Sequence, residues 1–330
     1  MVEFNGTTKK SKREIAKEEK EKLKIAERKE KAENEKKLLE DADLSEMTTQ
    51  QRVWVLTKMY LYAAKPFVMY MIMPAVVIAV GGFLCYGNVK KALDMYTQTA
   101  NNFYTFIGIV LALFSLWKTA KKRGSTVCEE VTLSFKNVNW EYILIMLAFG
   151  FCSAMCVSSL LSLIPDSLMV NYDKYTQSVY NSYDIPLLLV SISILDPIAE
   201  EIVFRGYMLN RLLPRLKEKK AVWIVTIIFA LCHIDPLWML IVVGFGYILA
   251  KISIRHDNIL YSIMLHIGFN IPTSLIYLIS TNETANDLLF GNKFLIFMYM
   301  IIFGGLTYFL TMLYLRKENL IDIGTGKIVK

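Results

Sequence analysis

The chain has 330 residues, of which 54% are hydrophobic, with a formal net charge of +7 and a mean hydropathy of +0.37. This composition is too apolar for an ordinary soluble domain, and several apolar runs are long enough to span a bilayer. In such a chain a positive net charge reports the orientation of loops before it reports nucleic acid. We therefore expect an integral membrane protein of the all-α class, with no nucleic-acid partner.

The first 65 residues differ from the rest because they hold 16 basic and 13 acidic residues, 29 of the 67 charged residues in the chain. Lysine and glutamate recur at helical spacing between Lys9 and Asp43, which predicts a solvated, partly frayed helix. Its few apolar residues do not sustain a heptad repeat, so a coiled coil is disfavoured. Residues 54–65 are amphipathic and aromatic, which is typical of an approach to the membrane interface.

Eight apolar segments follow, and we expect each to cross the bilayer as a helix. They cover residues 66–86, 103–117, 142–164, 185–209, 222–234, 237–254, 259–279 and 294–315. Basic residues concentrate before the first segment and after the second, fourth, sixth and eighth. The positive-inside rule then places both termini in the cytoplasm. The predicted architecture is a helical bundle over 66–317, with a cytoplasmic tail over 1–65 and a short one over 318–330.

The fourth segment is interrupted by an acidic motif that runs from Asp196 to Arg205. Charge at that depth is costly, and ionisable residues there indicate a functional site. Asp196 can cap a helix and Pro197 suits its first position, so the motif is predicted to begin a helix. On that helix Glu201 and Arg205 share a face and can form an ion pair. Glu200 is rotated away by about 100°, which leaves one carboxylate available for general-base chemistry.

The three histidines fall into two groups. His256 lies in a polar loop, and we interpret it as a solvated surface residue. His233 and His266 lie inside apolar runs, where a lone histidine is more often a satisfied core residue. Here they accompany Glu200 and Asn270 within the same few segments, and the bundle interior is where such side chains are least costly. We therefore expect one shared polar site.

Three kinds of chemistry fit such a site. A carboxylate and a histidine can deprotonate a water that attacks a carbonyl. Asn270, one helical turn from His266, can donate to the developing oxyanion, with His266 as a second donor. Alternatively, Glu200, His233 and His266 hold Zn²⁺, although no HExxH motif supports this. Ion or proton transport through the same groups is the third possibility.

Three motifs in this order closely resemble those of the CPBP family, which comprises the type II CAAX prenyl endopeptidases and the bacterial Abi or bacteriocin-processing proteins. The motifs are Glu200-Glu201-x-x-x-Arg205, Phe229-x-x-x-His233 and His266-x-x-x-Asn270. The residues around the first motif, Pro197 to Gly206, and the stretch that begins at Gly244 are similar to the family as well. The resemblance covers about residues 185–272, which we expect to be the catalytic core. The expected eight spans also agree with the family's core.

The resemblance implies an intramembrane endopeptidase. By resemblance, Glu200 and His233 activate the attacking water, whereas His266 and Asn270 form the oxyanion site. The supporting residues would be Glu201, Arg205 and Phe229. A glutamate-type mechanism without a metal cofactor is favoured, and a zinc metalloprotease that uses Glu200, His233 and His266 is the alternative. The expected partners are membrane lipid and a peptide or membrane-protein substrate, cleaved near the cytoplasmic face.

Two other classes of function compete with proteolysis. A non-proteolytic bacteriocin-immunity or scaffold protein can keep the same fold, but it has no need for the complete motif set. A secondary transporter usually shows internal repeats, and none is visible between the two halves. The lysine-rich composition suggests a bacterial chain, so we expect a bacterial plasma membrane.

Overall fold

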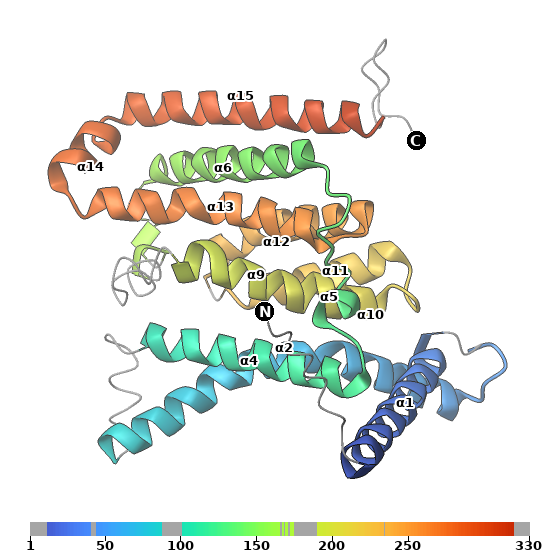
Figure 1. The fold of residues 1–330 in the computed structure, drawn as a ribbon. Coiled ribbons are helices and arrows are strands. Elements are labelled where there is room, and N and C mark those ends of the chain that lie inside the picture. The colour runs from blue at the N-terminus through green and yellow to red at the C-terminus, as the bar shows by residue number, and fades with distance from the viewer. Residues whose placement is uncertain are drawn as a thin grey trace, which may run out of the picture.

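The structure is a computed structural model that describes residues 12–40, 44–87, 101–165, 190–233 and 235–319, together with 167, 169–170 and 172–174. These residues are helical apart from turns and short connections, and no strand occurs among them. The long helices lie side by side (Figure 1). The predicted all-α membrane bundle is therefore confirmed.

The described elements include two π-helical segments, η1 and η2. In chain order the elements are α1 (Lys12–Glu40), α2 (Thr49–Tyr86), α4 (Asn101–Arg123), α5 (Val127–Glu130), α6 (Trp140–Ser162), η1 (Ser191–Leu195), α9 (Asp196–Glu201), η2 (Ile202–Leu209), α10 (Asn210–Leu212), α11 (Glu218–Leu231), α12 (Pro236–His256), α13 (Ile259–Ser280), α14 (Glu283–Phe290) and α15 (Lys293–Lys317).

Five helices are long and apolar enough to cross a membrane: α2, α6, α12, α13 and α15. The other three predicted segments fall on α4, on the run from η1 to α10 and on α11, while residues 185–189 lie outside the described part. The run from η1 to α10 carries the ionisable residues of the acidic motif, so its composition alone does not mark it as a span. The number of eight spans stays a prediction.

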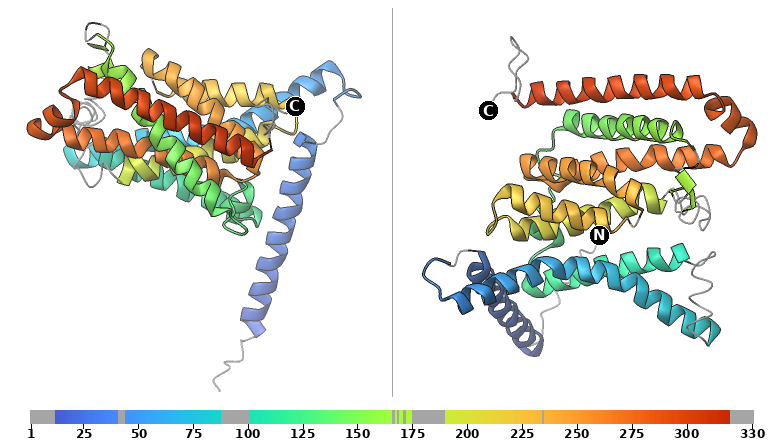
Figure 2. Two further views of the ribbon diagram at one scale, coloured as in Figure 1. Left: turned by 90° about the horizontal axis from the view of Figure 1, so that it is seen from above. Right: turned by 180° about the vertical axis from the view of Figure 1, so that it is seen from behind.

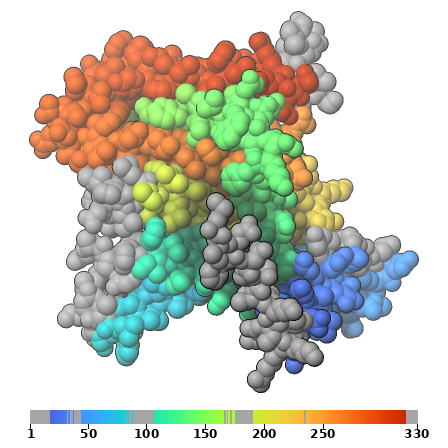
Figure 3. All heavy atoms as spheres, viewed as in Figure 1, coloured from blue at the N-terminus to red at the C-terminus, as the bar shows by residue number. Residues whose placement is uncertain are grey.

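Helix α13 lies next to α6 on one side and next to the run that carries the acidic motif on the other (Figure 1). A Cβ on Gly150 of α6 would lie 2.2 Å from the carbonyl oxygen of Leu265, and a Cβ on Gly268 would lie 2.4 Å from that of Leu147. The two glycines therefore allow the backbones of α6 and α13 to approach closely. Helix α15 covers the outer side of α6 (Figure 3).

The N-terminal region contains the expected helix, because α1 occupies Lys12–Glu40. It projects away from the bundle (Figure 2) and contacts the end of α4, where Lys29 packs against Gly124. Helix α2 starts at a capping box formed by Thr48 and Gln51 and continues to Tyr86. The expected interfacial approach over 54–65 and the first span therefore form one helix, and the predicted boundary after residue 65 falls inside it.

The ends of α4, α12 and α15 and the connection from α10 to α11 lie at one end of the bundle (Figure 1). We call it the basic end, and its basic residues are Lys121, Lys122, Arg123, Arg215, Lys217, Lys219, Lys220, Lys251, Arg255, Arg316 and Lys317.

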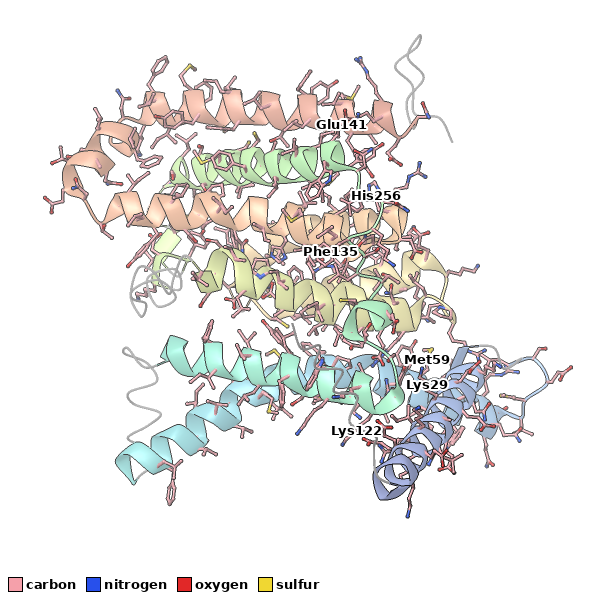
Figure 4. All side chains as sticks on the ribbon, in the orientation of Figure 1. Lys29, Met59, Lys122, Phe135, Glu141 and His256 are labelled. Carbon is pink, nitrogen blue, oxygen red and sulfur yellow. The ribbon has the colours of Figure 1, made fainter. Side chains whose placement is uncertain are left out.

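The interpretation of His256 as a solvated residue is wrong. It is half-buried at the end of α12, near Glu141 of α6 (Figure 4). Its ring stacks on Tyr261 with ring centroids 4.3 Å apart, and its Nε2 lies 3.3 Å from the hydroxyl of Tyr314. Aromatic residues of neighbouring helices cover the ring, because the last turn of α12 packs into the bundle before the chain turns.

Candidate active site

The α-helix α9 begins at Asp196, as predicted, but the π-helical turn η1 precedes it without a break, so the acidic motif lies inside a continuous helical run. Val190 and Asp196 both have right-handed helical backbone angles, and no side-chain cap precedes the motif. The predicted side-chain cap by Asp196 is therefore wrong. The π-helical turn η1 explains why: a proline inside an α-helix clashes with the preceding turn, and a π-bulge is one way in which a helix accommodates such a break.

Glu201 and Arg205 form the ion pair that their spacing predicts. Nη1 of Arg205 donates to Oε1 of Glu201 at 2.7 Å, and neither side chain is exposed. Nη2 of Arg205 donates to the carbonyl oxygen of Gly246 on α12 at 3.0 Å. The guanidinium carbon also lies 4.4 Å from the ring centroid of Phe229 on α11. These contacts compensate a charge that would otherwise be costly to bury.

Gly246 has a role that its sequence position does not reveal. A Cβ at this residue would lie 3.0 Å from Cδ1 of Phe229 and 3.4 Å from Nη2 of Arg205. Glycine therefore lets the backbone of α12 come close enough to accept from the guanidinium. In the sequence, the one sign of this close packing is a glycine inside an otherwise apolar helix.

His266 lies between the two adjacent carboxylates. Its Nδ1 is 3.0 Å from Oε1 of Glu201, and its Nε2 is 3.7 Å from Oε2 of Glu200. An ionised carboxylate only accepts, so Nδ1 carries a proton and donates to Glu201. The distance to Glu200 is too long for a direct hydrogen bond. Glu201 therefore orients the imidazole, and the other ring nitrogen faces Glu200.

Glu200 is the more accessible of the two carboxylates. Its side chain keeps 20% of its surface exposed, whereas that of Glu201 is fully buried. Glu200 faces His266, whereas Arg205 pairs with Glu201. This matches the division of roles that the helical geometry predicts.

His233 presents one nitrogen to the site. Its Nδ1 lies 2.9 Å from the carbonyl oxygen of Phe229 and therefore donates, which leaves Nε2 as an acceptor. The ring of Phe229 meets both histidines, with ring centroids 4.9 Å from His233 and 5.9 Å from His266. Among the described residues, no hydrogen bond or ion pair joins His233 to Glu200. The buried Phe229 ring thus sets the separation of the two histidines.

Asn270 lies one turn beyond His266 on α13. Its Nδ2 donates to the carbonyl oxygen of Ile192 in η1 at 2.9 Å. An asparagine amide has two N–H groups, so one remains for another acceptor. The contact brings the π-helical turn and the third motif together.

Asp196 is a further acidic residue near the site, and the sequence assigned it only to a helix cap. It precedes Glu200 by one turn of α9, so the two side chains share a face. Its Oδ1 is buried and has no hydrogen-bond partner. The four-residue spacing to Glu200 is the signal that identifies it.

The alternative zinc site would need its ligands grouped around one point. In the described part of the chain, no group of three or more His, Cys, Asp or Glu residues is arranged to hold a metal ion. Glu200, His233 and His266 therefore do not form a compact ligand set in this arrangement.

Comparison with known families identifies a domain of a described family. Residues 182–272 match the model of the family described as type II CAAX prenyl endopeptidase Rce1-like. No curated protein matches the chain, and no solved structure matches it either. The matched range contains all three motifs and the contacts that join them. Residues 182–272 therefore form an Rce1-like domain, which supports the CPBP resemblance that the three motifs predict.

Proposed function

We propose that this protein is an intramembrane endopeptidase that hydrolyses a peptide bond with a water activated by Glu200. The Rce1-like family implies an endopeptidase of the CAAX type. One observation carries the assignment of the base: Glu200 is the accessible carboxylate of an adjacent pair whose other member is committed to Arg205. A base must reach a water, and the buried Glu201 does not meet that requirement.

The reaction then follows from the donors and acceptors. Glu200 takes a proton from the water as its oxygen bonds to the substrate carbonyl carbon, and Nε2 of His233 accepts from the same water. The carbonyl oxygen becomes an oxyanion, which Asn270 and Nε2 of His266 stabilise by donation. When the carbon–nitrogen bond breaks, the proton on Glu200 passes to the leaving amine.

Donation by Nε2 requires a protonated His266, because its Nδ1–H is directed at Glu201. The charges around the ring support this state. Glu200 and Glu201 supply two negative charges, and Arg205 and a protonated His266 supply two positive charges. These four side chains then carry no net charge, and Asp196, one turn before Glu200, is a further acidic group beside them.

We further propose that the basic end of the bundle faces the cytoplasm and that the substrate is cut near that face. The positive-inside rule favours this orientation for both termini. The plasma membrane of a bacterium remains the proposed location. No metal is required by the mechanism; zinc bound by Glu200, His233 and His266 is the competing form, against which the spread of these ligands argues.

The test compares membrane peptides in cells that carry wild type, Glu200→Gln or Gly244→Ala, with expression and membrane insertion matched. Gly244→Ala is the control, because a Cβ at Gly244 meets nothing within 4 Å. We expect defined fragments with wild type and with the control, and none with Glu200→Gln. Identical peptide profiles in all three strains, with a cellular phenotype rescued equally, would overturn proteolysis and favour an immunity or scaffold protein.

A further inference from the structure

The backbone of η1 leaves one carbonyl without its regular partner. In a π-helical turn each N–H pairs with the carbonyl five residues earlier, and the N–H of Asp196 pairs in this way with the carbonyl of Ser191. The next N–H in that register would belong to residue 197 and would reach the carbonyl of Ile192. Residue 197 is proline, which has no N–H. The carbonyl of Ile192 is therefore free to accept from elsewhere.

The side chain of Asn270 takes this acceptor. Its Nδ2 lies 2.9 Å from the oxygen of Ile192. A carbonyl only accepts, so the nitrogen side of the amide must face Ile192, and the amide cannot flip without losing the bond. With one N–H held, the direction of the second N–H on the same nitrogen is fixed as well.

A second contact docks the same turn on α13. Oγ of Ser193 donates to Oγ of Ser274 at 2.9 Å, and both side chains are buried. Ser274 lies one turn beyond Asn270, so the Ser193–Ser274 and Ile192–Asn270 hydrogen bonds join η1 and α13 at neighbouring positions. The docking of the turn and the orientation of the amide can therefore be separated experimentally.

We infer that Pro197 is a positioning residue: by withholding an N–H from the carbonyl of Ile192, it reserves that carbonyl to orient the amide of Asn270 toward the reacting oxygen. The inference rests on the proposed function, because the oriented N–H is the proposed oxyanion donor. It assigns roles to a proline and a backbone carbonyl that do not themselves touch the substrate.

The first experiment observes the amide directly. Purified protein labelled with ¹⁵N-asparagine is compared as wild type, Pro197→Ala and Ser274→Ala, and the Asn270 side-chain signals are assigned by their loss in Asn270→Ala. We expect two well-separated proton signals with slowed exchange in wild type and in Ser274→Ala. In Pro197→Ala the new N–H competes for the carbonyl, and the two signals should converge and exchange faster. Unchanged signals in Pro197→Ala would overturn the inference.

The second experiment measures the rate at which Glu200-dependent fragments appear. Removal of an oxyanion donor typically lowers the rate about 10²–10³-fold. Because Pro197→Ala misorients the donor without removing it, we expect its rate of fragment formation to fall about 10-fold or more below that of wild type. If Pro197 acts through Asn270, the variant Pro197→Ala/Asn270→Ala is no slower than Asn270→Ala alone. Losses that multiply would show that the two residues act independently and would overturn the inference.

The control separates this failure from a failure of the proposed function. Ser274→Ala removes the neighbouring hydrogen bond from Ser193 and leaves the hydrogen bond between Asn270 and Ile192 intact. We therefore expect fragments to form at a rate within about 2-fold of wild type. If Glu200→Gln still produces fragments, the proposed function fails first. If Glu200→Gln abolishes them while Pro197→Ala is as fast as wild type, only the positioning role of Pro197 fails.

Discussion

His266 and Glu201, 65 residues apart in the chain, meet at 3.0 Å between Nδ1 and Oε1. The same oxygen accepts from Nη1 of Arg205 at 2.7 Å. One buried carboxylate oxygen therefore holds both the arginine of the first motif and the histidine of the third. This oxygen therefore contributes both to the geometry of the site and to the stability of the bundle. Glu200 does not pair with Arg205 and takes no part in this arrangement.

The two adjacent glutamates are expected to respond differently to the same substitution. Glu201→Gln leaves the buried charge of Arg205 without its counter-ion, and breaking such a pair costs about 3–5 kcal/mol. Glu200→Gln breaks no ion pair with an arginine, and we expect a change within about 1 kcal/mol. Thermal unfolding of the two purified variants in the same detergent measures the difference. Equal stabilities would contradict the assignment of a structural role to Glu201.

Arg205→Lys is expected to be destabilising although the charge is kept. Lysine cannot donate to both Glu201 and the carbonyl of Gly246 with a planar fork, and it loses the contact with the face of Phe229. We expect a loss of about 2 kcal/mol or more, on the scale of charged hydrogen bonds. Removing both charges with Glu201→Gln and Arg205→Met should restore part of the stability that Glu201→Gln loses. A double variant that is less stable than either single variant would count against this account.

A water activated by Glu200 predicts that activity survives removal of metal ions. Purified enzyme dialysed against a chelator should retain its Glu200-dependent cleavage, and added Zn²⁺ should not raise the rate. A metalloprotease would lose its activity under the same treatment and regain it with Zn²⁺. Metal analysis of the dialysed sample shows whether the chelator removed what was bound.

Much of the fold follows from the sequence because long apolar runs have few structural alternatives in a membrane. The pairing of Glu201 with Arg205 is equally predictable, since residues four apart on a helix are neighbours. The contacts that join different helices are not. The carbonyl of Gly246 reaches Arg205 only because α12 packs closely at that point, and local spacing carries no information about this packing.

The error at Asp196 has a similar cause. Asp-Pro is a common helix start, and a local interpretation therefore places a cap there. The chain continues as a helix because η1 takes the π form and because Asn270, more than 70 residues later, satisfies the carbonyl of Ile192. His256 was likewise placed by its polar neighbours, whereas Tyr261 and Tyr314 from other helices decide its environment.

The close approach of α6 and α13 gives a prediction that is independent of the mechanism. Gly268→Ala would bring a Cβ to 2.4 Å from the carbonyl oxygen and 2.9 Å from the Cα of Leu147, both backbone atoms that cannot rotate away. Overpacking of this kind costs about 1–3 kcal/mol. The matched control is Gly244→Ala on α12, which meets nothing within 4 Å and should gain up to about 1 kcal/mol from the better helix propensity of alanine.

The readout for this pair of variants is thermal unfolding together with fragment formation. Because α13 carries both His266 and Asn270, a displacement of α13 should slow cleavage in Gly268→Ala as well as lower its stability. In Gly244→Ala we expect neither effect. If Gly268→Ala were as stable and as active as Gly244→Ala, the two helices could not be packed as closely as Leu147 and Gly268 indicate, and the placement of the third motif against Glu200 and Glu201 would have to be revised.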